Sequence, residues 1–130
     1  MILIKIKDPG VRLLWTNSWW DGPLAGLLIF SNKHLYFKIV KEKYNKIGRW
    51  RKFALYHLTE EQMEEENYWH ELFCKHVGTH NNFNEKGERE GKLLPQTNWH
   101  KFYNEYPNKE PLILNHISIV GFMVEQCEND

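Results

Sequence analysis

A segment rich in histidine and cysteine is the first part of this 130-residue chain whose residue types could do chemistry. It contains His70, Cys74, His76 and His80. His70 and Cys74 are four positions apart and share one face of a helix, and imidazole nitrogen and thiolate sulfur are both zinc ligands. His76 points to another side of that helix. Because two ligands do not complete a zinc site, we expect no metal and no cofactor, and His70 and Cys74 are only weak metal candidates.

An aromatic loop, residues 19–23, offers a different kind of site. Its sequence is Trp-Trp-Asp-Gly-Pro. Two adjacent tryptophans cannot easily both point inward from an extended loop, so we expect at least one to be exposed or to line a groove. Exposed Trp is a common anchor of binding sites. We therefore predict that Trp19, Trp20 and Asp21 contact a partner. Tryptophan at the entrance of a strand more often only plugs the end of a sheet, with Asp21 in a turn, and this competing interpretation stays open.

Basic and aromatic residues are interleaved between positions 33 and 52. Positive charges that follow phosphates, beside rings that stack on bases, are typical of proteins that bind single-stranded nucleic acid. No RNA-binding sheet motif and no helix-turn-helix pattern accompanies them. The residues of this alternative polyanion surface are Lys38, Lys41, Lys43, Lys46, Arg49, Arg51 and Lys52. The competing interpretation is a solvated hairpin whose lysines lie near an acidic helix.

That acidic helix is the strongest local signal in the sequence. Thr59 and Gln62 match a capping box, and Leu58 and Met63 occupy the positions of a hydrophobic staple, so a helix is predicted over 60–77. Its acidic residues, Glu60, Glu61, Glu64 and Glu65, lie off the apolar stripe. Acidic side chains that face solvent steer a protein toward a basic partner surface. We include these four residues in the predicted partner-binding surface.

Motifs of the common enzyme classes are absent from the sequence. There is no nucleophile elbow, phosphate-binding glycine loop or dinucleotide fingerprint. The possible acid–base residues, Asp21, His34, His57, Glu71 and His100, are scattered. We expect no catalytic activity, and a small enzyme with an unidentified acid–base site is an alternative.

Charge is divided unevenly along the chain. Residues 1–58 carry eleven Lys and Arg against three Asp and Glu, a net charge of +8, and residues 59–130 carry a net charge of −8. The two cysteines cannot form a disulfide framework. The N-terminus lacks the apolar core of a signal peptide, and no apolar run is long enough to span a membrane. We therefore expect a cytoplasmic protein without a membrane partner.

Strands are predicted in the first half of the chain and again near its end. Alternating apolar residues and apolar runs indicate strands at 2–7, 11–15, 24–30, 34–40, 50–58 and 113–125, the last as one strand or a hairpin. Gly26, inside an apolar run, indicates a bulge or a close approach of another backbone. The short link 31–33 predicts an antiparallel hairpin.

A short aromatic helix and a polar loop complete the predicted elements. Trp99, Phe102, Tyr103 and Tyr106 recur at helical spacing, and the helix is expected to start near Thr97. Residues 78–96 are predicted to form a mobile polar loop, and residues 126–130 a frayed tail.

These elements predict one α+β domain over 1–130, a curved antiparallel sheet of five to seven strands with one long and one short helix packed against it. We expect a small cytoplasmic protein-interaction or inhibitor-type module, with a protein partner favoured over nucleic acid.

Overall fold

The chain forms two compact units in a computed structural model. Unit 1 comprises Met1–His57 and Asn115–Asp130, and unit 2 comprises Leu58–Leu114. The structure describes residues 1–105, 112, 114–115 and 118–128. Unit 1 contains seventeen Lys, Arg, Asp and Glu with a net charge of +5, and unit 2 seventeen with a net charge of −5. The predicted single domain, and the packing of the helices against the sheet, stay predictions.

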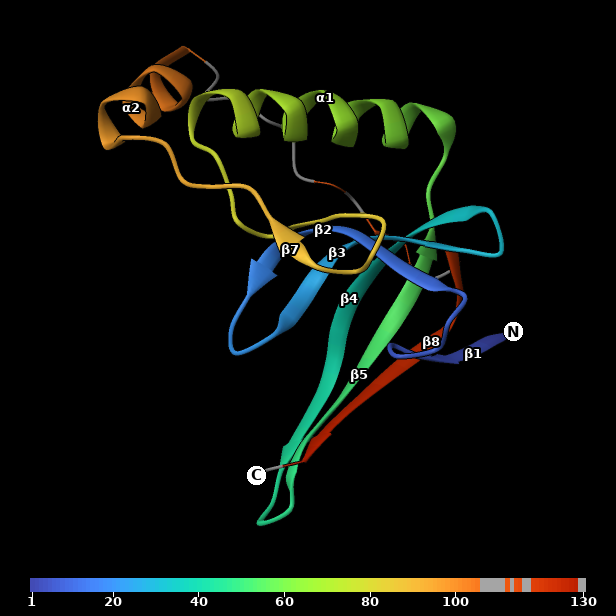
Figure 1. Cartoon of the computed structure of the whole chain (residues 1–130). Coiled ribbons are helices and arrows are strands. Elements are labelled where there is room, and N and C mark those ends of the chain that lie inside the picture. The colour runs from blue at the N-terminus through green and yellow to red at the C-terminus, as the bar shows by residue number, and fades with distance from the viewer. Residues whose placement is uncertain (106–111, 113, 116–117, 129–130) are drawn as a thin grey trace. The chain divides into compact units, whose positions relative to one another are not determined.

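Unit 1 contains six strands of the sheet (Figure 1). Their spatial order is β1-β8-β5-β4-β3-β2. The strands are β1 (Ile2–Lys5), β2 (Val11–Trp19), β3 (Pro23–Phe30), β4 (Lys33–Tyr44), β5 (Gly48–His57) and β8 (Ile119–Glu128). With two short strands of unit 2, the described residues contain eight strands and two helices.

The sheet is mixed, which corrects the predicted antiparallel sheet, and the eight described strands exceed the five to seven predicted. β1 pairs in parallel with β8, from Ile2 opposite Gly121 to Lys5 opposite Val124. The other pairs in unit 1 are antiparallel. The turn at residues 8–10 does not return the chain beside β1 but carries it to β2, at the other edge of the sheet. By the pairings in between, β2 runs in the same sense as β1, whereas a hairpin partner of β1 would run the opposite way. Turn residues alone do not indicate which strand the chain reaches next.

The short link between the two edge strands requires the sheet to curve. Five flat strand spacings would separate β1 from β2 by about 24 Å. Six residue steps span at most about 21 Å when fully extended. The link is shorter still, because Asp8 N donates to Lys5 O over 2.9 Å and Val11 N donates to Asp8 O over 3.0 Å. The edges therefore approach each other without pairing, and the sheet stays open.

The concave face of this sheet holds the apolar core. Strand alternation places one set of residues inside, namely Ile4, Leu28, Leu35, Phe37, Phe53, Leu55 and Met123. Phe37 and Phe53 meet edge to face with ring centroids 5.6 Å apart. Near the N-terminal end of β5, Arg51 and Arg49 continue the same alternation as Phe53 and point to the same face of the sheet. The core face therefore changes from apolar to charged along this strand.

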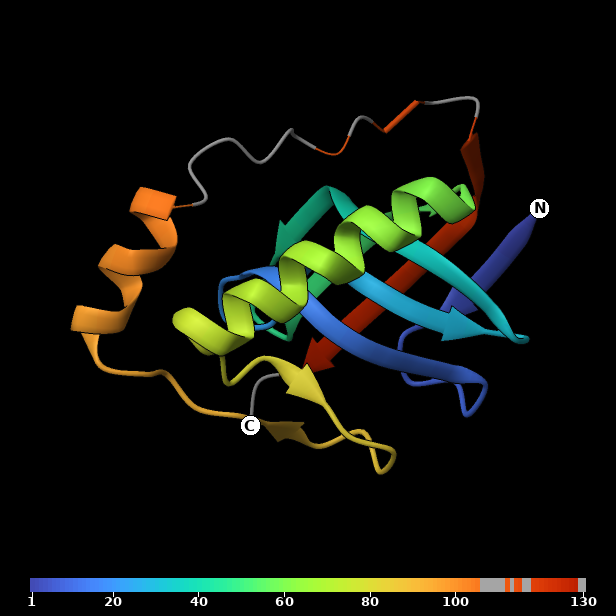
Figure 2. The same cartoon turned by 90° about the horizontal axis from the view of Figure 1, so that it is seen from above.

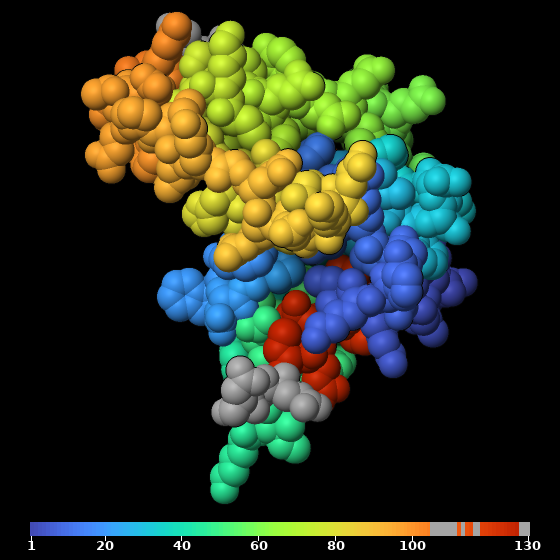
Figure 3. Space-filling view, in the orientation of Figure 1, coloured from blue at the N-terminus to red at the C-terminus, as the bar shows by residue number. Residues whose placement is uncertain are grey.

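Two hairpins organise the middle of unit 1. The β3–β4 hairpin confirms the prediction at residues 31–33, with Ser31 at φ 50° and Asn32 at φ 62°, as a two-residue hairpin turn requires. The β4–β5 hairpin is longer than the predicted strands 34–40 and 50–58, because β4 continues to Tyr44 and β5 begins at Gly48. Its tip, in green, projects from the rest of unit 1 (Figure 3). β8 pairs with β5 as far as Glu128, so 126–128 of the predicted frayed tail lie in the sheet.

Unit 2 begins with the capped helix. α1 (Glu60–His76) starts at Thr59, whose side chain accepts from Gln62 N over 3.1 Å, while Gln62 Oε1 accepts from Thr59 N over 3.0 Å. This confirms the capping box and the predicted helix. α2 (Gln96–Glu105) lies beside the C-terminal end of α1 (Figure 2). Tyr106, the last residue of the predicted aromatic motif, lies outside the described residues.

Aromatic contacts hold the two helices of unit 2 together. Phe102 is 8% exposed and its ring lies 5.7 Å from that of Phe73 and 6.5 Å from that of Trp69. The predicted loop 78–96 contains a short hairpin of β6 (Asn82–Phe83) and β7 (Arg89–Glu90). The mobility of this segment stays a prediction. Neither described helix is long and apolar enough to cross a membrane.

Candidate functional site

The turn between β2 and β3 exposes the most accessible tryptophan side chain in the described structure. Trp20 is 72% exposed, whereas Trp19, at the end of β2, is partly buried. The turn closes through Trp20 N, which donates to Gly22 O over 2.9 Å. Gly22 has φ 124°, and a Cβ there would lie 2.8 Å from Arg49 Nη2. The positive φ therefore favours glycine here, and a larger residue would also displace the end of the Arg49 side chain.

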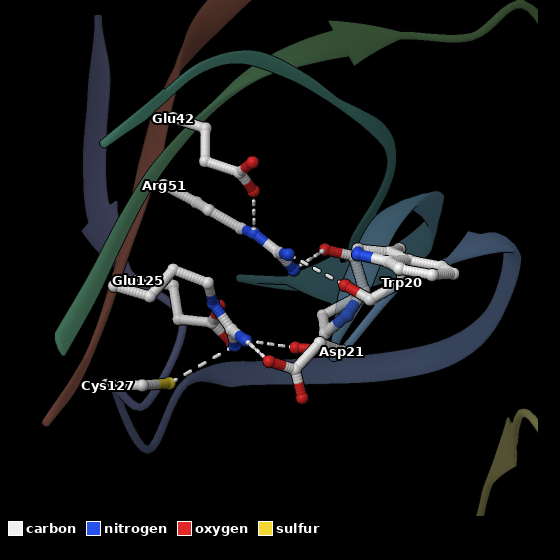
Figure 4. A network of polar contacts seen from close by, with 8 residues as sticks. Trp20, Asp21, Glu42, Arg51, Glu125 and Cys127 are labelled. Atoms are coloured by element: carbon white, nitrogen blue, oxygen red, sulfur yellow. Dashed lines mark hydrogen bonds and ion pairs between the residues drawn. The ribbon is translucent and has the colours of Figure 1, made fainter. Parts of the chain in front are cut away.

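Arg51 supports this turn from inside the sheet. Its side chain is fully buried, although arginine is almost never buried without partners. Nη2 donates to Trp20 O over 2.7 Å, Nη1 makes a longer contact with Pro23 O at 3.4 Å, and Nε pairs with the carboxylate of Glu42 (Figure 4). One guanidinium therefore connects β4, β5 and both ends of the exposed turn.

Arg49, two positions earlier on β5, supports the tip of the same turn. It donates to the carbonyl of Asp21 and pairs with the Asp21 carboxylate at 3.0 Å. Nη2 also pairs with Glu125 Oε1 at 3.0 Å and lies 3.4 Å from Cys127 Sγ (Figure 4). Arg49 thus binds both the carbonyl and the carboxylate of Asp21, although 82% of the Asp21 side chain is exposed. The backbone of the turn is thus fixed at three carbonyls, whereas its side chains face outward.

The charges in this network shift two pKa values. Partial desolvation opposes the shift at Glu42, but hydrogen bonding with Tyr44 and Arg51, together with the positive charges of Arg51 and Arg49, lowers its pKa below 4.5. At Arg49, burial also opposes the shift, and the Glu125 carboxylate raises the pKa of the guanidinium. Both groups therefore stay ionised over the physiological range.

The network corrects the predicted polyanion surface. Arg49 and Arg51 lie on the concave face, where they pair with carboxylates, so they are not available to phosphates. Their partners Glu42, Glu125 and Cys127 were not predicted as site residues. The sequence did contain a signal for the position of the two arginines. Arg49 and Arg51 alternate in step with Phe53 and Leu55, which indicates that all four point to the same face of the sheet.

The remaining predicted lysines lie elsewhere. Lys38, Lys41, Lys43 and Lys52 occupy the convex face of the sheet, and Lys46 lies at the tip of the β4–β5 hairpin. Lys43 Nζ is 5.6 Å from the centroid of the Trp50 ring, and Lys52 Nζ is 4.4 Å from that of Phe122. Both contacts confirm that these side chains share one face.

The acidic residues of α1 are exposed. Glu60, Glu61, Glu64 and Glu65 all lie on the solvent side of the helix. Glu65 Oε1 accepts from Trp69 Nε1 over 2.9 Å, so this carboxylate is partly used within the helix. Glu66, by contrast, is 5% exposed. Three carboxylates in the first two turns, Glu60, Glu61 and Glu64, therefore present their charge to solvent.

His70 and Cys74 meet, as their spacing predicts, and a third residue joins them. His70 Nε2 lies 3.5 Å from Cys74 Sγ and 2.9 Å from Asn82 Oδ1. Asn82 Nδ2 lies 3.6 Å from Cys74 Sγ. Burial lowers the pKa of His70, although hydrogen bonding with Asn82 and the charge of Glu71 oppose the shift. Asn82 was missed because β6 brings it back to α1 over twelve residues.

This cluster has the residue types of a thiol catalytic triad but a different geometry. In such a triad one imidazole nitrogen takes the thiol proton and the other is oriented by the third residue. Here Cys74 and Asn82 both contact Nε2 of His70. Nor do the described side chains include any group of three or more His, Cys, Asp or Glu placed to hold a metal ion. The cluster therefore supports neither the enzymatic alternative nor a metal site.

Comparisons with family models, with curated proteins and with solved structures find no match to this chain.

Proposed function

We propose that this chain is a cytoplasmic protein-binding module whose β2–β3 turn is the anchor for its partner. One observation carries the proposal: Trp20 is 72% exposed on a turn whose backbone is held by Arg51 and Arg49. A merely structural plug would bury its ring. Trp is enriched among the residues that dominate binding energies, because it supplies a large contact area for few frozen torsions.

The arginine support reduces the cost of binding. Association normally loses free energy when loops and side chains become ordered at an interface. Here the carbonyls of Trp20, Asp21 and Pro23 already have guanidinium donors. Only the Trp20 side chain remains to be ordered, so most of its contact area contributes to affinity. A partner with an apolar pocket fits an exposed indole.

Replacement of Trp20 tests this proposal. A tagged wild-type chain is used to isolate the partner from a cytoplasmic extract, and the dissociation constant is then measured calorimetrically. Removing a dominant anchor costs at least about 2 kcal/mol, so Trp20→Ala is expected to weaken binding at least about 30-fold. Tyr103→Ala is the control, because Tyr103 is also an exposed aromatic, at 56%, and lies on α2, outside the proposed surface. Equal affinities of Trp20→Ala and the wild type would refute the proposal.

The acidic residues of α1 are proposed to steer a basic partner toward the module. Charges outside the centre of an interface act mainly on the association rate and its salt dependence. The variant Glu60→Gln/Glu61→Gln/Glu64→Gln is expected to slow association at low salt and to leave dissociation nearly unchanged. Its control removes three other exposed carboxylates of unit 2, Glu85, Glu88 and Glu90. Equal association rates of both variants would remove the helix from the proposal.

A further inference from the structure

Going beyond the protein-binding turn, we propose that the lysine-bearing part of the convex face of the unit 1 sheet binds single-stranded nucleic acid. Leu27, Tyr36 and Ala54, on the same side of the sheet, are buried and are not part of this site. The site is a lysine face assembled from four strands. Its cations are Lys5 on β1, Lys38, Lys41 and Lys43 on β4, and Lys52 on β5. Two rings, Trp50 on β5 and Phe122 on β8, lie among them.

Strand register shows that these lysines form one surface. Lys41 lies opposite Lys52, Lys52 opposite Val124, and Val124 opposite Lys5. This is a continuous row across β4, β5, β8 and β1, since paired residues point to the same side of a sheet. Lys43 lies opposite Trp50 in the next row, and Lys38 opposite Ala54 in the row on the other side. The positive charges therefore cover three adjacent rows.

On the described strands of unit 1, Glu128 at the end of β8 is the one acidic residue whose register position lies on the side of the lysine face, opposite Gly48. The ion pairs of Arg49 and Arg51 with Asp21, Glu42 and Glu125 lie on the concave face. Strand alternation has sent Glu42 and Glu125 to those arginines and the lysines to the other side. Lys41 and Lys52 are directly opposite, and like charges in that position destabilise a sheet. An anionic ligand that follows the row would relieve this repulsion.

The rings favour single strands among anionic ligands. Bases stack on aromatic side chains regardless of sequence, and a basic surface follows the phosphates. Trp50 and Phe122 are partly exposed, and each has a lysine ammonium above its ring. A base can replace the ammonium on the ring while the flexible lysine moves to the adjacent phosphate. A duplex or a lipid surface offers the same charge but no free base faces.

The test measures binding of a labelled oligothymidylate of about 15 nucleotides, within the usual range of site sizes, by fluorescence anisotropy. Affinity is measured between about 50 and 200 mM salt. Each phosphate contact adds about 0.7 to the slope of log affinity against log salt, so Lys41→Gln/Lys43→Gln should reduce the slope by about 1.4. The control Lys86→Gln/Lys101→Gln removes two exposed lysines of unit 2 and should leave the slope unchanged.

Trp50→Ala tests the choice of ligand. Loss of one stacked base should weaken oligothymidylate binding about 5- to 150-fold and leave binding to a duplex of equal length unchanged. Urea unfolding verifies that the variants are folded. If Trp50→Ala does not fold, the variant Lys41→Gln/Lys43→Gln still tests the proposal. No binding at low salt, equal slopes of both lysine variants, or phosphatidylserine vesicles binding as tightly as the oligonucleotide would each overturn the proposal. Trp20→Ala should bind the oligonucleotide normally, which separates this site from the turn.

Discussion

The Glu42–Arg51 pair predicts an unequal response to removal of its two partners. Arg51 has no exposed surface, whereas 29% of the Glu42 side chain is exposed. Glu42→Ala leaves a guanidinium buried without its carboxylate, and breaking a buried pair in this way costs about 3–5 kcal/mol. Because Arg51 keeps its hydrogen bond to Trp20 O, we expect Glu42→Ala to lower the free energy of unfolding by about 3 kcal/mol, the lower end of that range.

Arg51→Met should lower the free energy of unfolding by less than Glu42→Ala does. The carboxylate that remains can be hydrated through its exposed part, and the variant removes a buried charge. What is lost is one short bond from a charged donor to Trp20 O, and the contact with Pro23 O at 3.4 Å adds little. We expect a loss of about 1–2 kcal/mol. The double variant should cost less than the sum of the single ones, with a coupling energy of about 1–3 kcal/mol.

Equilibrium urea unfolding, followed by circular dichroism, measures these free energies. Lys38→Ala, on the same strand as Glu42 but on the convex face, is the control and should change stability by less than about 0.5 kcal/mol. The reasoning fails if Arg51→Met costs more than Glu42→Ala. It also fails if the costs of the single variants add, since the two side chains would then not be coupled.

Four further variants test other parts of the structure. Gly26→Ala should cost about 2–3 kcal/mol in urea unfolding, because its Cβ would lie 2.2 Å from Trp15 O, a backbone atom that cannot move aside cheaply. Thr59→Ala should lose about 1 kcal/mol by the same measurement, since α1 loses its cap. The pKa of His70, measured by NMR, should lie below 6.5. Between that lowered pKa and 6.5 the unfolded chain binds more protons than the folded chain, so the free energy of unfolding should rise as pH rises through this interval. His70→Gln should abolish the rise. The pKa of Glu42 is lowered too, so its contribution is present above pH 4.5 and lost as pH falls below it, and Glu42→Gln should flatten that loss.

Local features of the fold were predictable where neighbouring residues in the sequence satisfy each other. The capping box at Thr59 and Gln62 joins groups three residues apart, and the β3–β4 hairpin needs only two residues at positive φ. The close approach at Gly26 was also predicted, and it is confirmed by the backbone of β2 against that residue. The capping box and the hairpin turn need no information about distant segments, whereas the backbone against Gly26 comes from another strand.

The candidate site was only partly predictable. Exposure of one of the two adjacent tryptophans follows from their position in a turn, and the His70–Cys74 contact follows from helical spacing. Both arginines were nevertheless placed on the wrong surface. Their alternation with Phe53 indicates the concave face, but a charged residue is usually expected outside unless its partners are known. Those partners, Glu42 and Glu125, come from different strands.

The amino-acid sequence by itself determined which residues alternate on each strand, where α1 begins, and that opposite charges occur in different parts of the chain. Only the tertiary structure decided that β1 pairs in parallel with β8, which places Lys5 in the same row as Lys41 and Lys52, with Val124 of β8 between Lys5 and Lys52. It also brought Arg51 to the carbonyl of Trp20, thirty-one residues away. The physical reason is that alternation and capping depend on neighbours, whereas strand order and buried ion pairs depend on which distant segments the core brings together.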